Sequence, residues 1–337
     1  MTIRMDLGEN SYDIVVERGV LGRACELLDL NRRVLVVTDS GVPAQYSKTL
    51  AEQCKSAVIV TLDEGESSKS LECFGRLLQT MLDAGFSRKD CVVAVGGGVV
   101  GDLSGFAAAS YMRGIDFYNI PTTLLSQIDS SIGGKTAINL GSVKNIVGAF
   151  YQPKKVLIDP ELLKTLPKRQ LSNGLAEAIK MSLTSDKELF ELIEVGDVNE
   201  DLDEILVRSL MVKKNVVEAD ERESGLRRIL NFGHTVGHGI ESASCGELYH
   251  GECVALGMIP MCGESIRGRV VEVLKKCELY REMRLDWEAI KNAAFHDKKA
   301  DGGCVSAVFV PSVGEFEIKT LGCDEIVETA KSVLDKR

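Results

Sequence analysis

Histidine is rare in this chain, and three of its four histidines lie between positions 234 and 250. His234 and His238 are spaced i and i+4, so they share one face of a helix. Two imidazoles on one helix face are a common platform for a metal ion. Thr235 follows His234, which excludes the HExxH pattern of zinc proteases. The sequence therefore predicts a metal site of another kind around these histidines.

A carboxylate is the expected partner of these imidazoles in a metal site. His250 stands in Tyr-His-Gly-Glu, at the start of a predicted helix. Glu177, Glu241 and Glu252 are all compatible with a ligand role on spacing alone, and this choice stays open. The competing interpretation is that these are ordinary histidines at helix ends. The clustering of so rare a residue favours the metal.

A second feature is a glycine-rich turn that connects a predicted strand to a predicted helix. It contains Gly96, Gly97, Gly98 and Gly101. Glycines allow backbone N–H groups to approach a pyrophosphate at the N-terminus of a helix. The turn lacks the common GxGxxG spacing and follows the third predicted strand instead of the first. The alternative is a turn whose glycines serve only close packing.

Cations in apolar or glycine-rich contexts form a third feature. They are Lys135, Lys144, Lys180, Lys213, Arg227, Lys298 and Lys299. Each one alone is typical of a solvated surface. As a convergent set they would suit a substrate that carries both phosphate and carboxylate.

The positions of apolar residues predict the elements that carry these groups. In the first half, strands are expected at Arg33–Asp39, Ala57–Leu62 and Cys91–Val95, and helices at Val42–Ser56, Ser70–Ala84 and Val99–Ser110. This alternation is typical of an α/β domain with a mostly parallel sheet. The second half is mainly helical, with helices expected at Glu161–Leu166, Gln170–Ser182, Leu202–Glu218, His234–Ala243, Gly251–Arg267 and Asp324–Leu334, and strands at Cys304–Val310 and Glu315–Thr320. We therefore predict an α/β domain over residues 1–159 and a mainly helical domain over residues 160–337.

Composition narrows the class of protein. The 337 residues are 45% hydrophobic and carry a net charge of −10, which argues against nucleic-acid binding. No apolar run reaches the ~18 residues of a membrane span. The ten cysteines are scattered without a CxxC pair, which is typical of reduced thiols in a cytoplasmic protein.

Taken together, several segments resemble the 3-dehydroquinate synthase family. They are Gly96-Gly-Gly-Val-Val-Gly-Asp102, Pro121-Thr-Thr, Asp129-Ser-Ser-Ile-Gly-Gly-Lys135, Asn173-Gly-Leu-Ala-Glu177-Ala-Ile-Lys180, Glu218-Ala-Asp-Glu-Arg-Glu223, Gly225-Leu-Arg227, Leu230-Asn-Phe-Gly-His234-Thr-Val-Gly-His238 and His250-Gly-Glu. The match runs in order from about Glu64 to Lys299. The resemblance implies an α/β NAD-binding domain followed by a mostly α-helical metal-binding domain.

The resemblance also implies a role for each matched residue. The metal ligands, for zinc or cobalt, fall on Glu177, His234 and His250, and His238 moves to the substrate pocket. NAD contacts fall on Asp39, Glu64, Gly65, Glu66, Ser67, Ser68, Lys69, Gly97, Gly98, Val99, Val100, Gly101, Asp102, Thr122, Thr123, Lys135, Lys144, Leu162, Leu163, Lys164 and Thr165. Catalytic positions fall on Asp129, Lys135, Lys180, Lys213, Arg227, Asn231 and His238, and further substrate contacts on Asn145, on Lys298 or Lys299, and on Arg113. In the family this arginine reaches the neighbouring subunit's pocket, which implies a homodimer.

The implied reaction converts 3-deoxy-D-arabino-heptulosonate 7-phosphate to 3-dehydroquinate and phosphate, a step of the shikimate pathway. It proceeds by transient oxidation with NAD, β-elimination of phosphate, re-reduction, ring opening and an intramolecular aldol closure. Two alternatives stay open. Another sugar phosphate cyclase would share the NAD and metal motifs, and a metal-dependent polyol dehydrogenase would produce net NADH.

Overall fold

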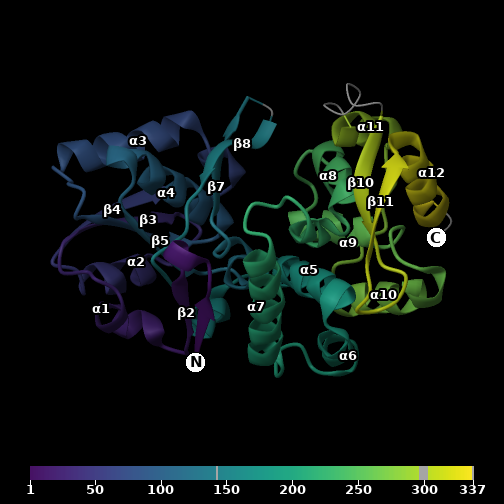
Figure 1. Cartoon of the computed structure of the whole chain (residues 1–337), viewed down its shortest axis with the longest axis horizontal. Coiled ribbons are helices and arrows are strands. Elements are labelled where there is room, and N and C mark those ends of the chain that lie inside the picture. The colour runs from purple at the N-terminus through teal and green to yellow at the C-terminus, as the bar shows by residue number, and fades with distance from the viewer. Residues whose placement is uncertain (142, 296–302, 336–337) are drawn as a thin grey trace. The chain divides into compact units, whose positions relative to one another are not determined.

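The computed structural model describes residues 1–141, 143–295 and 303–335, and it forms two compact units (Figure 1). The first unit is Met1–Pro167 and the second is Lys168–Arg337. The boundary expected at Asp159-Pro160 falls within the first unit, where the 3-10 helix η6 (Pro160–Thr165) begins.

A seven-stranded sheet forms the centre of the first unit. Its strands are β1 (Thr2–Met5), β2 (Tyr12–Val16), β3 (Arg33–Asp39), β4 (Ser56–Leu62), β5 (Cys91–Gly96), β6 (Asp116–Pro121) and β9 (Lys155–Ile158). They lie in the order β1-β2-β9-β6-β5-β3-β4, and only β1 runs antiparallel to its neighbour. The prediction of an α/β domain with a mostly parallel sheet is confirmed.

Apolar layers cover both faces of this sheet, because side chains of a strand alternate between faces. Val34 and Val36 of β3 pack on one face with α1 (Ala24–Leu27) and α2 (Ala44–Ala51). Leu35 and Val37 pack on the other face with α3 (Leu71–Asp83) and α4 (Gly98–Ser110). Burial on both sides explains the continuous apolar runs of the central strands. A hairpin, β7 (Lys135–Leu140) and β8 (Val143–Phe150), packs on α4.

The order of the strands reverses between β3 and β5. Strand β3 leads through α2 to β4 on one side, whereas β5 leads through α4 to β6 on the other side. In open α/β sheets ligands bind outside the carboxyl ends of the strands at such a switch point. The glycine-rich turn after β5 therefore lies where a ligand site is expected, although it follows a late strand.

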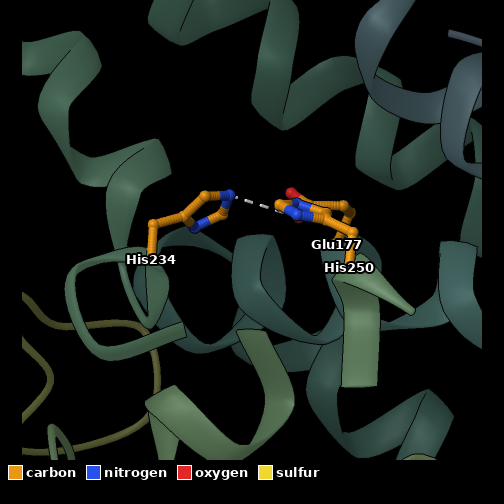
Figure 2. A group of neighbouring side chains, drawn as sticks. All are labelled: Glu177, His234 and His250. Atoms are coloured by element: carbon orange, nitrogen blue, oxygen red, sulfur yellow. Dashed lines mark ion pairs between the residues drawn. The ribbon is translucent and has the colours of Figure 1, made fainter. Parts of the chain in front are cut away.

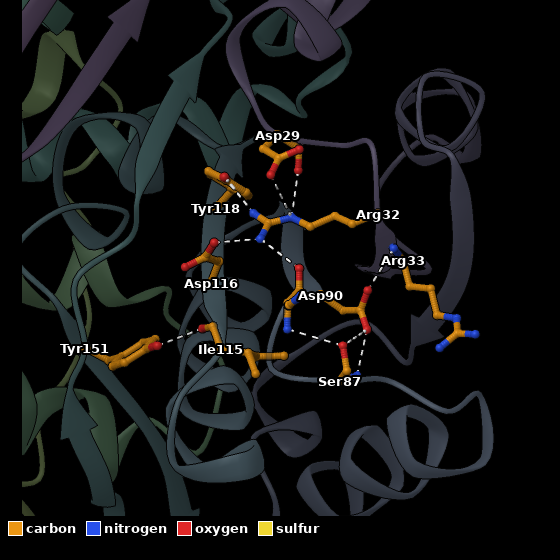
Figure 3. Close-up of polar contacts among 10 residues, drawn as sticks. Asp29, Arg32, Arg33, Ser87, Asp90, Ile115, Asp116, Tyr118 and Tyr151 are labelled. Atoms are coloured by element: carbon orange, nitrogen blue, oxygen red, sulfur yellow. Dashed lines mark hydrogen bonds and ion pairs between the residues drawn. The ribbon is translucent and has the colours of Figure 1, made fainter.

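At the amino ends of the parallel strands, opposite the switch point, Arg32 holds neighbouring strands together (Figure 3). Its side chain is 12% exposed. Its guanidinium donates to Asp116 Oδ2 at 2.7 Å, to the hydroxyl of Tyr118 at 2.9 Å and to the carbonyl of Lys89 at 3.1 Å. Arg32 therefore connects the amino ends of three neighbouring strands, at the opposite end of these strands from the switch-point loops.

Arg32→Met is expected to destabilise the first unit, because it removes these donors and keeps the aliphatic stem. We expect a loss of about 2 kcal/mol in the free energy of unfolding in urea, as for hydrogen bonds to charged groups. The matched control is Arg4→Met, whose partner Asp13 and own side chain are well exposed, at 36% and 59%. The control should change stability by less than about 0.5 kcal/mol. Equal losses of unfolding free energy in Arg32→Met and Arg4→Met would contradict the role of Arg32 in connecting the strands.

In its described residues, the second unit consists mainly of helices with one two-stranded sheet. The elements are α5 (Lys168–Ser185), α6 (Lys187–Val195), α7 (Leu202–Ala219), η7 (Leu226–Asn231), α8 (His234–Ala243), α9 (His250–Met258), α10 (Glu264–Lys276), α11 (Trp287–Phe295), β10 (Cys304–Phe309), β11 (Glu317–Gly322) and α12 (Cys323–Leu334). The predicted helix at His234–Ala243 has the observed bounds. The single helix expected at Gly251–Arg267 is wrong: it is two helices, and Pro260 follows the end of the first because proline cannot continue a helix. Within the described residues, no helix combines the length and the hydropathy that crossing a membrane requires.

Candidate metal centre and cofactor site

Helices α5 and α9 approach each other closely at a glycine. A Cβ atom added to Gly251 would lie 2.2 Å from the carbonyl oxygen of Asn173, so only glycine fits there. The backbone N–H of Gly251 also donates to Asn173 Oδ1 at 2.6 Å. Glu177 is one turn after Asn173 on α5, and His250 precedes Gly251. This crossing therefore sets the separation between Glu177 and His250.

A second glycine contact brings α8 against α9. A Cβ atom on Gly257 would lie 2.1 Å from the carbonyl oxygen of Gly233, and one on Gly237 would lie 3.0 Å from that of Cys253. Gly233 has φ +77°, a left-handed conformation that a side chain rarely adopts. Since His234 is the first residue of α8, this contact places its ring beside α9.

The two crossings bring together Glu177, His234 and His250 (Figure 2). His234 Nε2 and His250 Nε2 each lie 3.6 Å from Glu177 Oε1, and Figure 2 shows His234 pointing toward the other two side chains. Glu177 is 1% exposed, and apart from its ion pair with Lys180 its carboxylate oxygens accept no hydrogen bond within the described part of the chain. Two imidazoles and one carboxylate are a ligand set of catalytic zinc, so these residues fit a divalent metal ion.

Charged neighbours and burial shift the pKa values of all three residues. Burial would raise the pKa of Glu177, but the Lys180 ammonium, with which it forms an ion pair, holds that pKa well below its usual range. Burial and Lys180 lower the pKa of His234 to about 3, so this imidazole is neutral at neutral pH. Burial opposes protonation of His250, but Glu177 and Glu241 raise its pKa to about 9. A metal ion that binds there must displace a proton from His250.

The hydrogen bond of His234 identifies the nitrogen that faces Glu177. Its Nδ1 lies 3.1 Å from the carbonyl oxygen of Phe232. Because a carbonyl only accepts, Nδ1 carries the proton and Nε2 keeps its lone pair. The atom with the lone pair is the one directed at Glu177.

The three carboxylates that spacing left open have different surroundings. Glu177 lies against both imidazoles, and Glu241 accepts from His250 Nδ1 at 2.9 Å. Glu252 is 1% exposed and is bound by Arg169 and Arg281, each at 2.8 Å. It caps the first turn of α9 by accepting from the N–H of Tyr249 at 2.9 Å. Its two arginines give Glu252 a structural role in place of a ligand role.

The pair first suggested by helix spacing, His234 and His238, also lies together. Their ring centroids are 5.2 Å apart, and His238 is 5.9 Å from His250. His238, Glu241 and His250 form a second group with metal-ligand spacing, and it shares His250 with the first. His238 is exposed on the surface of the second unit.

The other predicted positions of the second unit lie around α5, α7 and η7. Lys213 is buried on α7, and Arg227 on η7 is 1% exposed. Asp220 fixes the loop before Arg227, because its carboxylate accepts from the N–H groups of Ser224, Gly225 and Arg227. Sequence reasoning gave Asp220 no role; its signal was an aspartate four residues before a Ser-Gly pair. Asn231 is exposed and donates to Glu223 at 2.7 Å.

In the first unit, some of the predicted NAD contacts lie on the loops that follow β3 and β5, at the switch point. The N-cap of α4 is Gly97, and no side chain caps this helix. A Cβ on Gly97 would lie 3.2 Å from Thr123, so the turn fits closely against the loop after β6. Asp39 ends β3, and burial together with the Glu64 carboxylate raises its pKa. An uncapped helix N-terminus with two flanking carboxylates fits a dinucleotide, since carboxylates bind ribose hydroxyls.

Lys69 connects two predicted groups of residues. It is 4% exposed and donates to Asp102 Oδ2 at 2.7 Å and to Asn145 Oδ1. Asn145 has φ +57° and donates its N–H to Asn139 Oδ1 at 2.8 Å. Asn145, expected at the substrate, therefore lies beside Lys69 and Asp102, which are expected at NAD.

The remaining predicted positions have varied surroundings. Lys135 and Lys144 are exposed on the hairpin, and Asp129 lies on the π-helix η5 (Ser126–Ser130). Leu162 and Leu163 are buried, whereas Lys164 pairs with Glu161. Thr122 is buried, and Thr165 is hydrogen-bonded to Tyr46 at 2.8 Å. Lys298 and Lys299 lie outside the described residues.

Comparison with known proteins identifies the family of this chain. The family profile of the 3-dehydroquinate synthase N-terminal domain matches residues 59–173, and that of the C-terminal domain matches residues 174–300. The 3-dehydroquinate synthase of Latilactobacillus sakei is 40% identical over 95% of each chain. The chain belongs to the 3-dehydroquinate synthase family.

Solved structures of other cyclases share the whole fold. A 2-deoxy-scyllo-inosose synthase, complexed with carbaglucose-6-phosphate, NAD+ and Co2+, has a TM-score of 0.90 at 26% identity and covers 99% of this chain and 100% of its own. A 2-epi-5-epi-valiolone synthase from Streptomyces hygroscopicus, with NAD+ and Zn2+ bound, has a TM-score of 0.88 at 30% identity and covers 98% of this chain and 99% of its own.

Proposed function

We propose that this chain converts 3-deoxy-D-arabino-heptulosonate 7-phosphate to 3-dehydroquinate and phosphate, with NAD and one zinc or cobalt ion as cofactors. The observation that carries the proposal is the convergence of two imidazole Nε2 atoms on the buried Glu177 carboxylate, next to Lys180. The identity of about 40% to 3-dehydroquinate synthases over nearly the full chain supports the choice of substrate.

The chemistry explains why a reaction without net redox change uses NAD. The C–H bond next to the phosphate-bearing carbon becomes acidic only when the adjacent hydroxyl is oxidised to a ketone. NAD supplies a reversible hydride acceptor, and a divalent ion held by Glu177, His234 and His250 supplies a Lewis acid. The ammonium of Lys180 would stabilise negative charge that develops on the substrate, and Asp129 is our candidate for proton transfer.

The remaining cations would bind the anionic ends of the substrate. Arg227 is buried and fixed through Asp220, which suits a guanidinium that holds a carboxylate or phosphate with two parallel hydrogen bonds. We assign Lys213, Asn231, His238, Lys135 and Asn145 to the same task. The loop residues from Glu64 to Lys69 and from Gly97 to Asp102 would bind NAD.

We further propose a homodimer in the cytoplasm. Met112 and Arg113 have φ of +50° and +68° and are both exposed. Two successive non-glycine residues in this conformation cost energy, and such strain is typical of functional turns. The turn presents Arg113 to solvent, as a contact with a neighbouring subunit would require. All ten cysteines are free thiols, which agrees with a reducing compartment.

Substrate choice tests the proposal against the main alternative, another sugar phosphate cyclase. We expect phosphate release from 3-deoxy-D-arabino-heptulosonate 7-phosphate with kcat/KM at least about a hundredfold above that for glucose 6-phosphate, of which carbaglucose-6-phosphate is a carbocyclic analogue. The physical reason is that cations placed for a carboxylate are left unpaired when the substrate lacks one. Faster release from glucose 6-phosphate would overturn the proposed substrate.

A further inference from the structure

Glu241 lies on the same face of α8 as the two histidines of that helix. His234, His238 and Glu241 are spaced i, i+4 and i+7, which places all three toward one side. Helix α8 packs on α9 through Gly237, next to this side, and His250 is the first residue of α9. The Glu241 carboxylate is 18% exposed, and its Oε2 lies 2.9 Å from His250 Nδ1.

We propose that Glu241 is a positioning residue of the metal centre, which holds the His250 ring so that Nε2, and not Nδ1, faces Glu177 and His234. This inference rests on the proposed function and adds to it a residue with no assigned role. A carboxylate that accepts from Nδ1 fixes the orientation of an imidazole and makes its other nitrogen a better ligand. His250 Nε2 does lie 3.6 Å from Glu177 Oε1.

The surroundings of the two imidazoles explain why His250 in particular needs a carboxylate. The His234 side chain is 14% exposed and its Nδ1 is held by a backbone carbonyl, so packing and the backbone orient it. The His250 side chain is 29% exposed and stands at the beginning of a helix, with less packing around it. The hydrogen bond from His250 Nδ1 to Glu241 prevents the ring from rotating so that its two nitrogens exchange places.

The same geometry decides between the two groups with metal-ligand spacing. One group needs His250 with Glu177 and His234, and the other needs it with His238 and Glu241. With Nδ1 donating to Glu241, the Nε2 atom of His250 remains for the first group. Glu241 therefore acts through His250, and His238, Glu241 and His250 are not a separate metal site.

The test compares metal binding by Glu241→Ala, Glu241→Gln and Glu247→Ala. Glu247 is exposed, six positions further on, and its replacement removes the same charge. Each protein is freed of metal with a chelator and titrated with Co2+ and with Zn2+ against a competing chelator. We expect Glu241→Ala to weaken binding by about 10- to 100-fold and to alter the visible absorption spectrum of bound Co2+. Glu241→Gln keeps an acceptor oxygen and should recover part of the loss, and Glu247→Ala should behave as the parent protein.

Thermal unfolding of the metal-free proteins separates positioning from a general structural role. Metal-free Glu241→Ala loses only the hydrogen bond to His250, so it is expected to melt slightly below the parent, and Glu241→Gln should recover part of that difference. Parent-like affinity and Co2+ spectrum in Glu241→Ala would overturn the inference. A lowered melting temperature of metal-free Glu241→Ala, without rescue by Glu241→Gln, would also overturn it. Failure of the parent protein to bind one ion would instead contradict the proposed metal centre, and this inference with it.

Discussion

Glu177→Gln is expected to abolish tight metal binding and to lower turnover by more than about 100-fold, the upper range for residues that only support a ligand. The reason is that both imidazole Nε2 atoms converge on the carboxylate of Glu177. Zinc content after dialysis and the rate of phosphate release measure the two effects. One equivalent of zinc held with parent affinity would contradict the assignment of Glu177.

A double variant separates loss of metal from loss of fold. Glu177 and Lys180 are 1% and 2% exposed and form a buried ion pair. Removing one partner of a buried pair costs about 3–5 kcal/mol, whereas replacing both by neutral groups is much less costly. Glu177→Gln combined with Lys180→Met should therefore regain the melting temperature of the metal-free parent but should still bind no metal. Metal binding by this folded double variant would show that other residues hold the ion.

Gly251→Ala is expected to have the second largest effect, because it forces apart the helices that carry Glu177 and His250. The new Cβ would lie 2.2 Å from the carbonyl oxygen of Asn173, a backbone atom that cannot move aside cheaply. Overpacking of this kind costs about 1–3 kcal/mol or more. We expect a lower free energy of unfolding together with weaker binding of zinc, measured on the same preparation.

The matched control for this substitution is Gly268→Ala on α10. No atom lies within 4 Å of a Cβ added there, and the residue is within a helix. This change should stabilise the protein by about 0.5–1 kcal/mol, since alanine restricts the unfolded chain and favours the helix. If Gly251→Ala behaved like Gly268→Ala, the close crossing of α5 and α9 would not set the geometry of the metal centre.

The sequence predicted those strands and helices in which the apolar residues follow an uninterrupted pattern. The observed β3 has the predicted bounds, and α4 begins one residue earlier than expected. Strand β6 was missed: it begins with Asp116, contains Asn119 and ends at Pro121, so no apolar run marks it. Its place in the sheet comes from pairing with β5 and β9, which are distant in the sequence.

In the candidate site, too, local sequence predicted some features, whereas others depend on contacts between distant segments. The clustering of histidines indicated a metal site, but spacing could not choose among three glutamates. The choice depends on α5 crossing α9 at Gly251 and on the arginines that bind Glu252, and both are tertiary contacts. Only the family resemblance placed the third ligand on Glu177 from the sequence, and the geometry of Glu177 agrees with it.

The most direct test of the central claim is phosphate release from 3-deoxy-D-arabino-heptulosonate 7-phosphate by chelator-treated protein, with zinc and NAD added back separately and together. The absorbance of NADH is followed in the same cuvette. We predict release of one phosphate per substrate only when both cofactors are present, with no net NADH. Release without NAD or without metal, or NADH that accumulates with turnover, would contradict the account.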